Sequence, residues 1–207
     1  MVIAVLGSDG RSGRAFVRAA LNNGHIIRAG YRNNAPSIEH ENYIPIKCNG
    51  ENPDEVALLI QDADAVLCLI GHVKGSHART QTESIRNIIA SMRKNNIKRL
   101  ISLTGTGVRF PGDRPNSIDK VLNFSIKLID PQRILDGIDH VEEIKYSDLD
   151  WTIVRVLKLQ NTRPTSFRLT EGGPAKLITS RVEVAKACLE VLEKNEFMQK
   201  APIISKG

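Results

Sequence analysis

Apolar and polar residues alternate along the chain in blocks that predict strands and helices in turn. The apolar runs that predict strands lie at 1–6, 25–31, 43–48, 63–70, 99–103, 151–157 and 201–205. Apolar stripes at helical spacing lie between them, at 14–22, 52–62, 80–95, 117–128, 136–146 and 181–194. The run at 63–70 is almost continuously apolar, as expected of a strand with helices on both faces of its sheet. The alternation predicts an α/β fold with a parallel, doubly wound sheet.

The first apolar run ends in a glycine loop, and the first helix follows at once. The loop is Gly7-Ser8-Asp9-Gly10-Arg11-Ser12-Gly13. A turn of this kind presents backbone N–H groups and the positive end of a helix dipole to an anion, usually a pyrophosphate. Glycines at this spacing also occur in purely structural turns, but the position directly after a strand favours a nucleotide site. All seven residues are therefore predicted to bind a cofactor.

No repeat or linker interrupts the pattern, so one domain is expected over residues 1–207. Two segments rich in glycine, proline and polar residues, about 108–116 and 160–177, are predicted to be loops that cover a small substrate pocket. The second is expected to hold a short strand or two. No apolar run approaches the roughly 20 residues of a membrane span, and no basic leader precedes the first run. The separated cysteines are expected to be reduced core residues of a cytoplasmic protein: Cys48, Cys68 and Cys188.

The net charge of +6 raises the question of a nucleic-acid partner. The basic residues are scattered, however, and aromatic residues, at 4%, are not interleaved with them as single-strand binding requires. We therefore favour a solvated basic surface with a pocket for a polyanionic cofactor. No nucleic acid, membrane or metal is expected as a partner.

The residues after the second predicted strand bear on which dinucleotide binds. A carboxylate normally stands about 20 residues beyond the glycines to bind the adenosine ribose, but here no acid appears until Glu39. Arg32 stands there instead, and a guanidinium pairs with a 2′-phosphate through two hydrogen bonds. The sequence therefore favours NADP(H) over NAD(H), although a solvated charge at a strand end also explains Arg32. Asn49 is predicted either to bind the adenine amine or to form an ordinary turn.

Several stretches of this sequence resemble stretches of a known family, and they occur in the same order as in that family. They are the glycine loop, Ala63-Asp64-Ala65-Val66 leading to Gly71, residues 101–107 (I-S-L-T-G-T-G), residues 147–155 (S-D-L-D-W-T-I-V-R) and residues 178–185 (I-T-S-R-V-E-V-A). Together they span almost the whole chain, and the D-W-T-I-V-R and S-R-V-E-V-A segments are the most specific. The chain resembles the small NAD(P)H-binding members of the atypical short-chain dehydrogenase/reductase family, akin to flavin reductases and NmrA-like proteins. The resemblance implies a single Rossmann-type domain.

The resemblance also implies roles for particular residues. Arg32 matches the basic residue of NADP-binding members, and the end of the fourth strand, which passes the ribose and pyrophosphate, is matched by Leu69, Ile70 and Gly71. Ser102 and Thr104 match positions where hydroxyls lie near the nicotinamide, to polarise a substrate carbonyl or simply to satisfy the local turn. The strand that lines the nicotinamide is matched through Val156 and Leu157, although the family's usual proline is Val156 here.

The chain departs from the wider superfamily at its Tyr-x-x-x-Lys pair. Tyr43 and Lys47 have the spacing, but they lie on a predicted strand with Pro45, so the match is interpreted as accidental. Near the position of the family's lysine stands His140, on the predicted helix at 136–146. His140 is a candidate to bind the nicotinamide ribose or donate a proton, since imidazole titrates near neutrality, and the alternative is an ordinary helix histidine.

Three functions fit these features to different degrees. The favoured one is an enzyme that moves hydride from NADPH to a small acceptor needing little acid help, such as a flavin, a quinone or a tetrapyrrole. The second is a non-catalytic module that senses NADP(H) and reports it to a protein partner. A nucleotide-sugar epimerase or dehydratase is the third, disfavoured because the chain is too short for the sugar-binding lobe.

Overall fold

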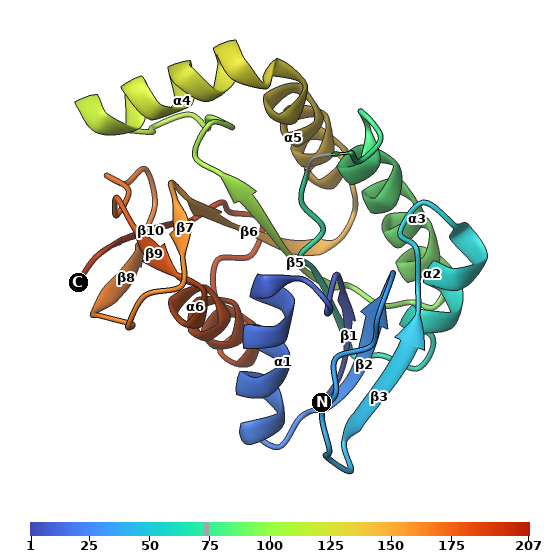
Figure 1. Cartoon of the computed structure of the whole chain (residues 1–207). Coiled ribbons are helices and arrows are strands. Elements are labelled where there is room, and N and C mark those ends of the chain that lie inside the picture. The colour runs from blue at the N-terminus through green and yellow to red at the C-terminus, as the bar shows by residue number, and fades with distance from the viewer. Residues whose placement is uncertain (73–74) are drawn as a thin grey trace.

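A computed structural model describes residues 1–72 and 75–207 (Figure 1). Its main sheet has the order β3-β2-β1-β4-β5-β6-β10-β8, and β7 pairs with β9 in a separate two-stranded sheet. The strands are β1 Val2–Leu6, β2 Ile26–Tyr31, β3 Tyr43–Lys47, β4 Ala65–Cys68, β5 Arg99–Gly105, β6 Asp150–Val156, β7 Leu159–Gln160, β8 Phe167–Thr170, β9 Thr179–Ser180 and β10 Ile203–Lys206. The helices are α1 Arg11–Asn22, α2 Pro53–Ile60, α3 Thr80–Lys94, α4 Ser117–Ile129, α5 Pro131–Lys145 and α6 Arg181–Glu193.

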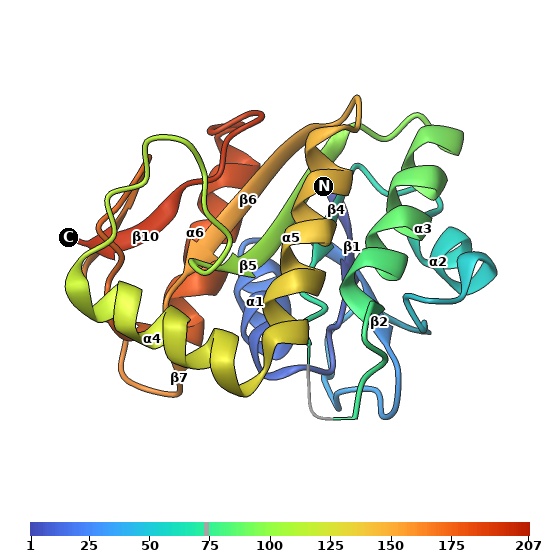
Figure 2. The same cartoon turned by 90° about the horizontal axis from the view of Figure 1, so that it is seen from above.

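The main sheet is parallel except at β8, which pairs antiparallel with β10. Successive side chains of a strand point to opposite faces, so β1 contributes to two cores. Ala4 and Leu6 pack with α2, α3 and α5, whereas Ile3 and Val5 pack with α1 and α6. Figures 1 and 2 show these two helical layers on opposite sides of the sheet. The predicted doubly wound Rossmann-like α/β fold is confirmed.

The strand order reverses between β1 and β4, and this reversal decides where a ligand binds. β2 and β3 lie on one side of β1, and β4, β5 and β6 lie on the other. In open α/β sheets, ligands bind beyond the carboxyl ends of the strands at such a switch point. The glycine loop, which follows β1 directly, stands at this place.

Most predicted elements are present, and the differences have local causes. The second of the two late helices begins at Pro131 and not at 136, because Asp130 caps it by accepting from the Arg133 N–H and proline suits the first helical position. The first helix begins at Arg11, so the end of the glycine loop is already its first turn. Segment 160–177 contains β8, in line with the expected short strand, and the start of the segment lies in β7.

The cysteines are buried and free, as predicted. Burial raises the pKa of Cys48 to about 12, that of Cys68 to about 11 and that of Cys188 to about 12, so all three remain unreactive thiols near neutral pH. No helix within the described ranges is both long and apolar enough to cross a membrane.

Candidate cofactor-binding site

The glycine loop turns sharply between β1 and α1 because three of its positions have no side chain. Gly7 has a φ of +77°, a region that favours glycine. A Cβ at Gly13 would lie only 2.1 Å from the Gly7 carbonyl oxygen, so the helix packs on the loop more closely than any other residue allows. Gly10 is the N-cap of α1, and no described side chain caps that helix end. The first N–H groups of α1 are therefore left for an anion.

A cavity of about 280 Å³ opens beside this loop, near the lower end of the range for ligand pockets. It lies between the carboxyl ends of β1, β2 and β4 and the start of α3. Eight of the residues predicted to bind the cofactor line it: Gly7, Asp9, Gly10, Arg32, Asn49, Leu69, Ile70 and Gly71. Sequence reasoning missed six others that line it: Asn33, Cys48, Gly50, Ser76, Thr80 and Ser84.

The remaining loop residues lie outside this lining. The Ser8 side chain is fully buried, and its Oγ and backbone N–H both donate to the Gly30 carbonyl oxygen, at 2.8 and 2.9 Å. Ser8 therefore ties the loop to β2. Arg11 is exposed and Ser12 half-buried in the first turn of α1, and Gly13 is buried against the loop.

Asp9 and Arg32 meet at the end of β2, a contact that the spacing along the chain does not predict. The Asp9 Oδ2 atom accepts from the backbone N–H groups of Arg32, at 3.2 Å, and Asn33, at 3.3 Å. The Asp9 carboxylate thus ties the glycine loop to the end of β2. The exposed Arg32 side chain lies at the same edge of the cavity.

Asn49 and Ser84 both line the cavity, and Ser84 packs against Gly50. The Asn49 Oδ1 atom accepts from the Glu51 N–H, as in an ordinary turn, which leaves its amide NH₂ as a potential donor. The Ser84 side chain is buried, and its Oγ has no hydrogen-bond partner among the described residues. A buried hydroxyl of this kind is satisfied when a polar ligand group fills the cavity. No sequence signal marked Ser84, because it is one of several polar residues on the buried side of α3.

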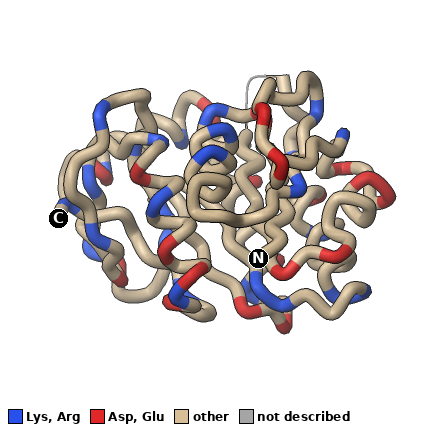
Figure 3. Tube along the Cα trace, turned by 90° about the horizontal axis from the view of Figure 1, so that it is seen from below, with Lys and Arg blue, Asp and Glu red and all other residues tan. Residues whose placement is uncertain are grey.

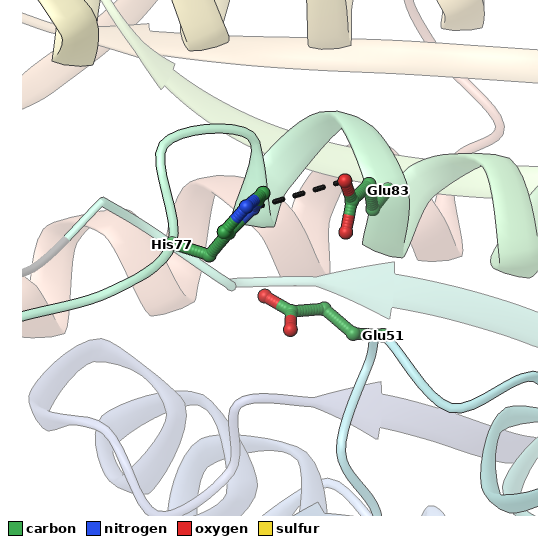
Figure 4. Close-up of side chains that lie close together, drawn as sticks. All are labelled: Glu51, His77 and Glu83. Atoms are coloured by element: carbon green, nitrogen blue, oxygen red, sulfur yellow. Dashed lines mark ion pairs between the residues drawn. The ribbon is translucent and has the colours of Figure 1, made fainter.

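Glu51, His77 and Glu83 converge between the Gly50 turn and the start of α3 (Figure 4). His77 Nδ1 lies 3.7 Å from Glu83 Oε1, and Glu51 Oε1 accepts from Thr80 Oγ1 at 2.7 Å. Such donors are acceptable to a divalent cation, but His77 is exposed, the glutamates are half-buried, and these contacts already join the Gly50 turn to the start of α3. The cluster is sufficiently explained as a link between two walls of the cavity.

The predicted catalytic residues Ser102 and His140 are in contact in the core. Ser102 Oγ and His140 Nε2 are 2.8 Å apart, and His140 Nδ1 lies 3.2 Å from the Gln81 carbonyl oxygen. Because that carbonyl can only accept, Nδ1 carries the proton and Nε2 accepts from the Ser102 hydroxyl. Burial lowers the pKa of His140 and outweighs the opposite effects of Gln81 and Asp136. His140 is thus a neutral imidazole that joins β5, α3 and α5.

This burial predicts a pH-dependent stability. The pKa of His140 is lowered in the folded protein but stays near its ordinary value of 6.5 in the unfolded chain. The contribution of neutral His140 to the free energy of unfolding is therefore complete above pH 6.5 and is lost as the pH falls below that value. We expect the free energy of unfolding to fall by up to about 1.4 kcal/mol per pH unit in that window. Urea unfolding at pH 5.5, 6.5 and 7.5 measures the slope. His140→Gln should flatten it, and an unchanged slope in that variant would rule out this origin.

The other residues predicted near the nicotinamide lie at the ends of β5 and β6. Thr104 is buried against α5, where a Cβ on Gly137 would lie 3.6 Å from its Oγ1. Val156 ends β6 and its carbonyl accepts from the Thr106 N–H at 2.9 Å, and Leu157 follows half-buried. These residues lie outside the lining of the 280 Å³ cavity, which covers the β1–β4 side of the switch point.

Arg155 of β6 anchors the predicted covering loop at 108–116, a role that sequence analysis missed. Its guanidinium donates to both carboxylate oxygens of Asp113, at 2.6 and 2.8 Å, and stacks on the Phe110 ring at 4.6 Å. Burial alone would raise the pKa of Asp113, but the hydrogen bonds from Arg155 and the Phe110 N–H outweigh it and lower the pKa below its usual range. The pair is an ionised, buried salt bridge that fixes this loop over the carboxyl ends of β5 and β6.

The glycine turn, the switch point and the cavity define a nucleotide-binding α/β protein. The chain belongs to the NAD(P)H-binding family, whose model matches residues 7–195. This agrees with the resemblance seen in the sequence. No curated protein matched the chain.

Solved structures share the fold at low sequence identity. A short-chain dehydrogenase/reductase from Veillonella parvula DSM 2008 in complex with NADP is 19% identical, with a TM-score of 0.83 over 99% of this chain and 94% of its own. An anaerobillin reductase from Escherichia coli O157:H7 is 16% identical, with a TM-score of 0.79 over 100% and 97%. A provisionally assigned NADH-flavin reductase from Streptococcus pneumoniae TIGR4 is 17% identical, with a TM-score of 0.79 over 100% of both chains. These likenesses establish the fold.

Proposed function

We propose that the protein is an oxidoreductase that transfers hydride from NADPH to a small conjugated acceptor such as a flavin or a quinone. One observation carries the proposal: the uncapped start of α1 and the Gly7–Gly13 turn open onto a cavity lined by eight residues predicted to bind a dinucleotide. The names of the flavin and anaerobillin reductases with the same fold are consistent with it.

The residues present fit the proposed cofactor. The N–H groups of the first turn of α1 would hold the diphosphate, and the Ser84 hydroxyl and Asn49 amide would bind the polar edge of the adenosine half. When bound, NADPH supplies the hydride. The chain itself contributes a cradle that orients the cofactor, and the loop held by Arg155 and Asp113 shields the carboxyl ends of β5 and β6 from water.

The acceptor class is inferred from the missing tyrosine acid. Tyr43 and Lys47 lie on strand β3, where residues four apart are not neighbours as they are in a helix, so they do not form the superfamily's pair. Flavins and quinones suit a site without that pair, because they accept hydride without prior activation of a carbonyl by a phenol.

The proposed preference for NADPH rests on Arg32, and variants of Arg32 and Asp9 test it. Arg32→Ala should weaken NADPH binding by at least about tenfold and NADH binding by much less, since only NADPH carries the 2′-phosphate that the guanidinium pairs with. Isothermal titration with both nucleotides measures the two losses. Asp9→Asn is the companion variant: it removes a negative charge at the same edge of the cavity, which would repel a 2′-phosphate, so it should not weaken NADPH binding. If Arg32→Ala weakened NADPH binding and NADH binding equally, Arg32 would not have the role assigned to it.

A second candidate function is an NADP(H) sensor that reports to a protein partner. It is favoured by α4, which has apolar side chains exposed to solvent: Ile118, Val121, Phe124, Leu128 and Ile129. The decay of NADPH absorbance after addition of flavin mononucleotide or menadione separates the two. Turnover clearly above that of Gly10→Asp, whose loop side chain blocks the phosphate site, supports the enzyme. Tight NADPH binding without turnover supports the sensor.

The proposed partners are small molecules, and the proposed compartment is the cytoplasm. In the view of Figure 3, basic and acidic residues are interspersed along the chain and do not gather in one basic stripe. This arrangement supports a solvated surface and gives no reason to propose a nucleic-acid partner. The three buried free thiols suit a reducing compartment.

A further inference from the structure

His72 stands at the carboxyl end of β4 with a buried ring nitrogen that lacks a hydrogen-bond partner. Its Nδ1 atom has no exposed surface and no partner within hydrogen-bond distance among the described residues. The Oδ2 atom of the Asp136 carboxylate lies 3.7 Å from it. The side chain keeps 11% of its surface exposed. Because Nδ1 is covered, that exposed part belongs to the other atoms of the side chain.

Asp136 is fixed in place as an ionised group. Its Oδ2 accepts from the Gln81 N–H at 3.0 Å and the Gln81 Nε2 at 3.3 Å, and its Oδ1 accepts from the Thr82 N–H at 3.0 Å and the Thr82 Oγ1 at 2.7 Å. Burial alone would raise the pKa of Asp136, but these hydrogen bonds outweigh it and lower the pKa. A carboxylate fixed in this way can hold the imidazole beside it in one orientation.

The pair lies between the cavity and the end of β5. Ile70 and Gly71, directly before His72, line the cavity, and β4 pairs with β5. Gly137, directly after Asp136, packs against Thr104 of β5. Figure 2 shows α5 lying beside α3 above this edge of the sheet. His72 is thus placed where the dinucleotide would pass from its adenosine half toward the reacting half.

We propose that His72 is the proton donor of the reaction and that Asp136 is a positioning residue that orients its imidazole. This inference rests on the proposed function. It assigns to His72 the role of proton donor, for which the sequence had offered His140 as a candidate.

The chemical balance is that of a two-electron reduction. A quinone acceptor gains a hydride, with its electron pair, from NADPH, which is oxidised to NADP⁺. A carbonyl oxygen of the acceptor forms an O–H bond with the proton from Nε2 of His72, whose N–H bond breaks to leave neutral imidazole. A proton from solvent then re-forms this N–H bond before the next turnover.

The test uses the full-length protein, NADPH and menadione. His72→Ala should lower kcat by about 10²-fold or more, the range for a general acid, with the NADPH dissociation constant changed less than twofold. Exogenous imidazole should restore part of the lost rate. His40→Ala, which removes an exposed histidine from the β2–β3 connection, should leave kcat unchanged. An unchanged kcat in His72→Ala, or a loss that imidazole does not restore, would overturn the proposal.

The role of Asp136 is tested by coupling the two residues. Asp136→Asn should lower kcat in the wild-type background but cause no further loss in His72→Ala, because it acts through His72. Equal losses in both backgrounds would show a merely structural role and overturn that assignment. Failure of the proposed function can be distinguished from failure of this inference, because the wild-type protein itself would then show no menadione turnover.

Discussion

Replacing Gly13 with alanine is expected to abolish tight NADPH binding and to destabilise the fold. The added Cβ would lie 2.1 Å from the Gly7 carbonyl oxygen and 2.7 Å from the Ser8 Cα, whereas real Cβ contacts essentially never fall below 3.0 Å. Helix α1 must therefore move away from β1, which carries its N–H groups off the diphosphate. Such overpacking costs about 1–3 kcal/mol of stability. A binding loss of at least about tenfold corresponds to 1.4 kcal/mol of lost interaction.

The control for this change is Gly24→Ala. Gly24 has the same φ of +77° as Gly7, but open space surrounds it, and it lies in the turn between α1 and β2, away from the cavity. It should cost about 1 kcal/mol through backbone strain alone. Isothermal titration and urea unfolding of both variants separate binding from stability. Wild-type NADPH affinity in Gly13→Ala would show that the loop does not hold the cofactor.

Replacing Arg155 with methionine should produce the largest loss of stability. The Arg155 side chain is 2% exposed and that of Asp113 is 5% exposed, so the change leaves a buried carboxylate without its cation. The Nε hydrogen bond to the Ala201 carbonyl, at 2.9 Å, is lost as well. Breaking a buried pair in this way costs about 3–5 kcal/mol. Urea unfolding at neutral pH measures the loss.

Two further variants show whether the loss comes from the unpaired charge. The double variant with Arg155→Met and Asp113→Leu should recover much of the stability, since it removes both charges. Arg86→Met breaks the exposed pair with Glu143 and should change stability little. A single Arg155→Met variant as stable as the wild type would show that the pair does not hold the 108–116 loop.

The parts of the structure that could be predicted are those that depend on a few consecutive residues. The glycine loop, the start of the helix predicted at 52–62 and the apolar run of β4 each lie within a few consecutive residues, and each element forms close to where it was expected. The start of α5 was placed too late although Asp130 and Pro131 carry the usual signal of a capping residue followed by proline. That error came from relying on apolar spacing alone.

The site was harder to predict because its polar contacts join residues far apart in the chain. Asp9 reaches the backbone of Arg32, and His72 faces Asp136 across 64 positions. Ser102 and His140 were both named as candidates, but their contact with each other depends on how α5 packs on β5. No spacing rule within one element shows such pairs, since strand order and helix packing create them.

The most direct test of this account is calorimetric titration of the wild-type protein with NADPH, with a melting curve at each concentration. A glycine turn that holds the diphosphate predicts saturable binding of one nucleotide per chain and a melting temperature that rises with ligand concentration. No heat of binding and no change in melting temperature at millimolar NADPH would contradict the central claim.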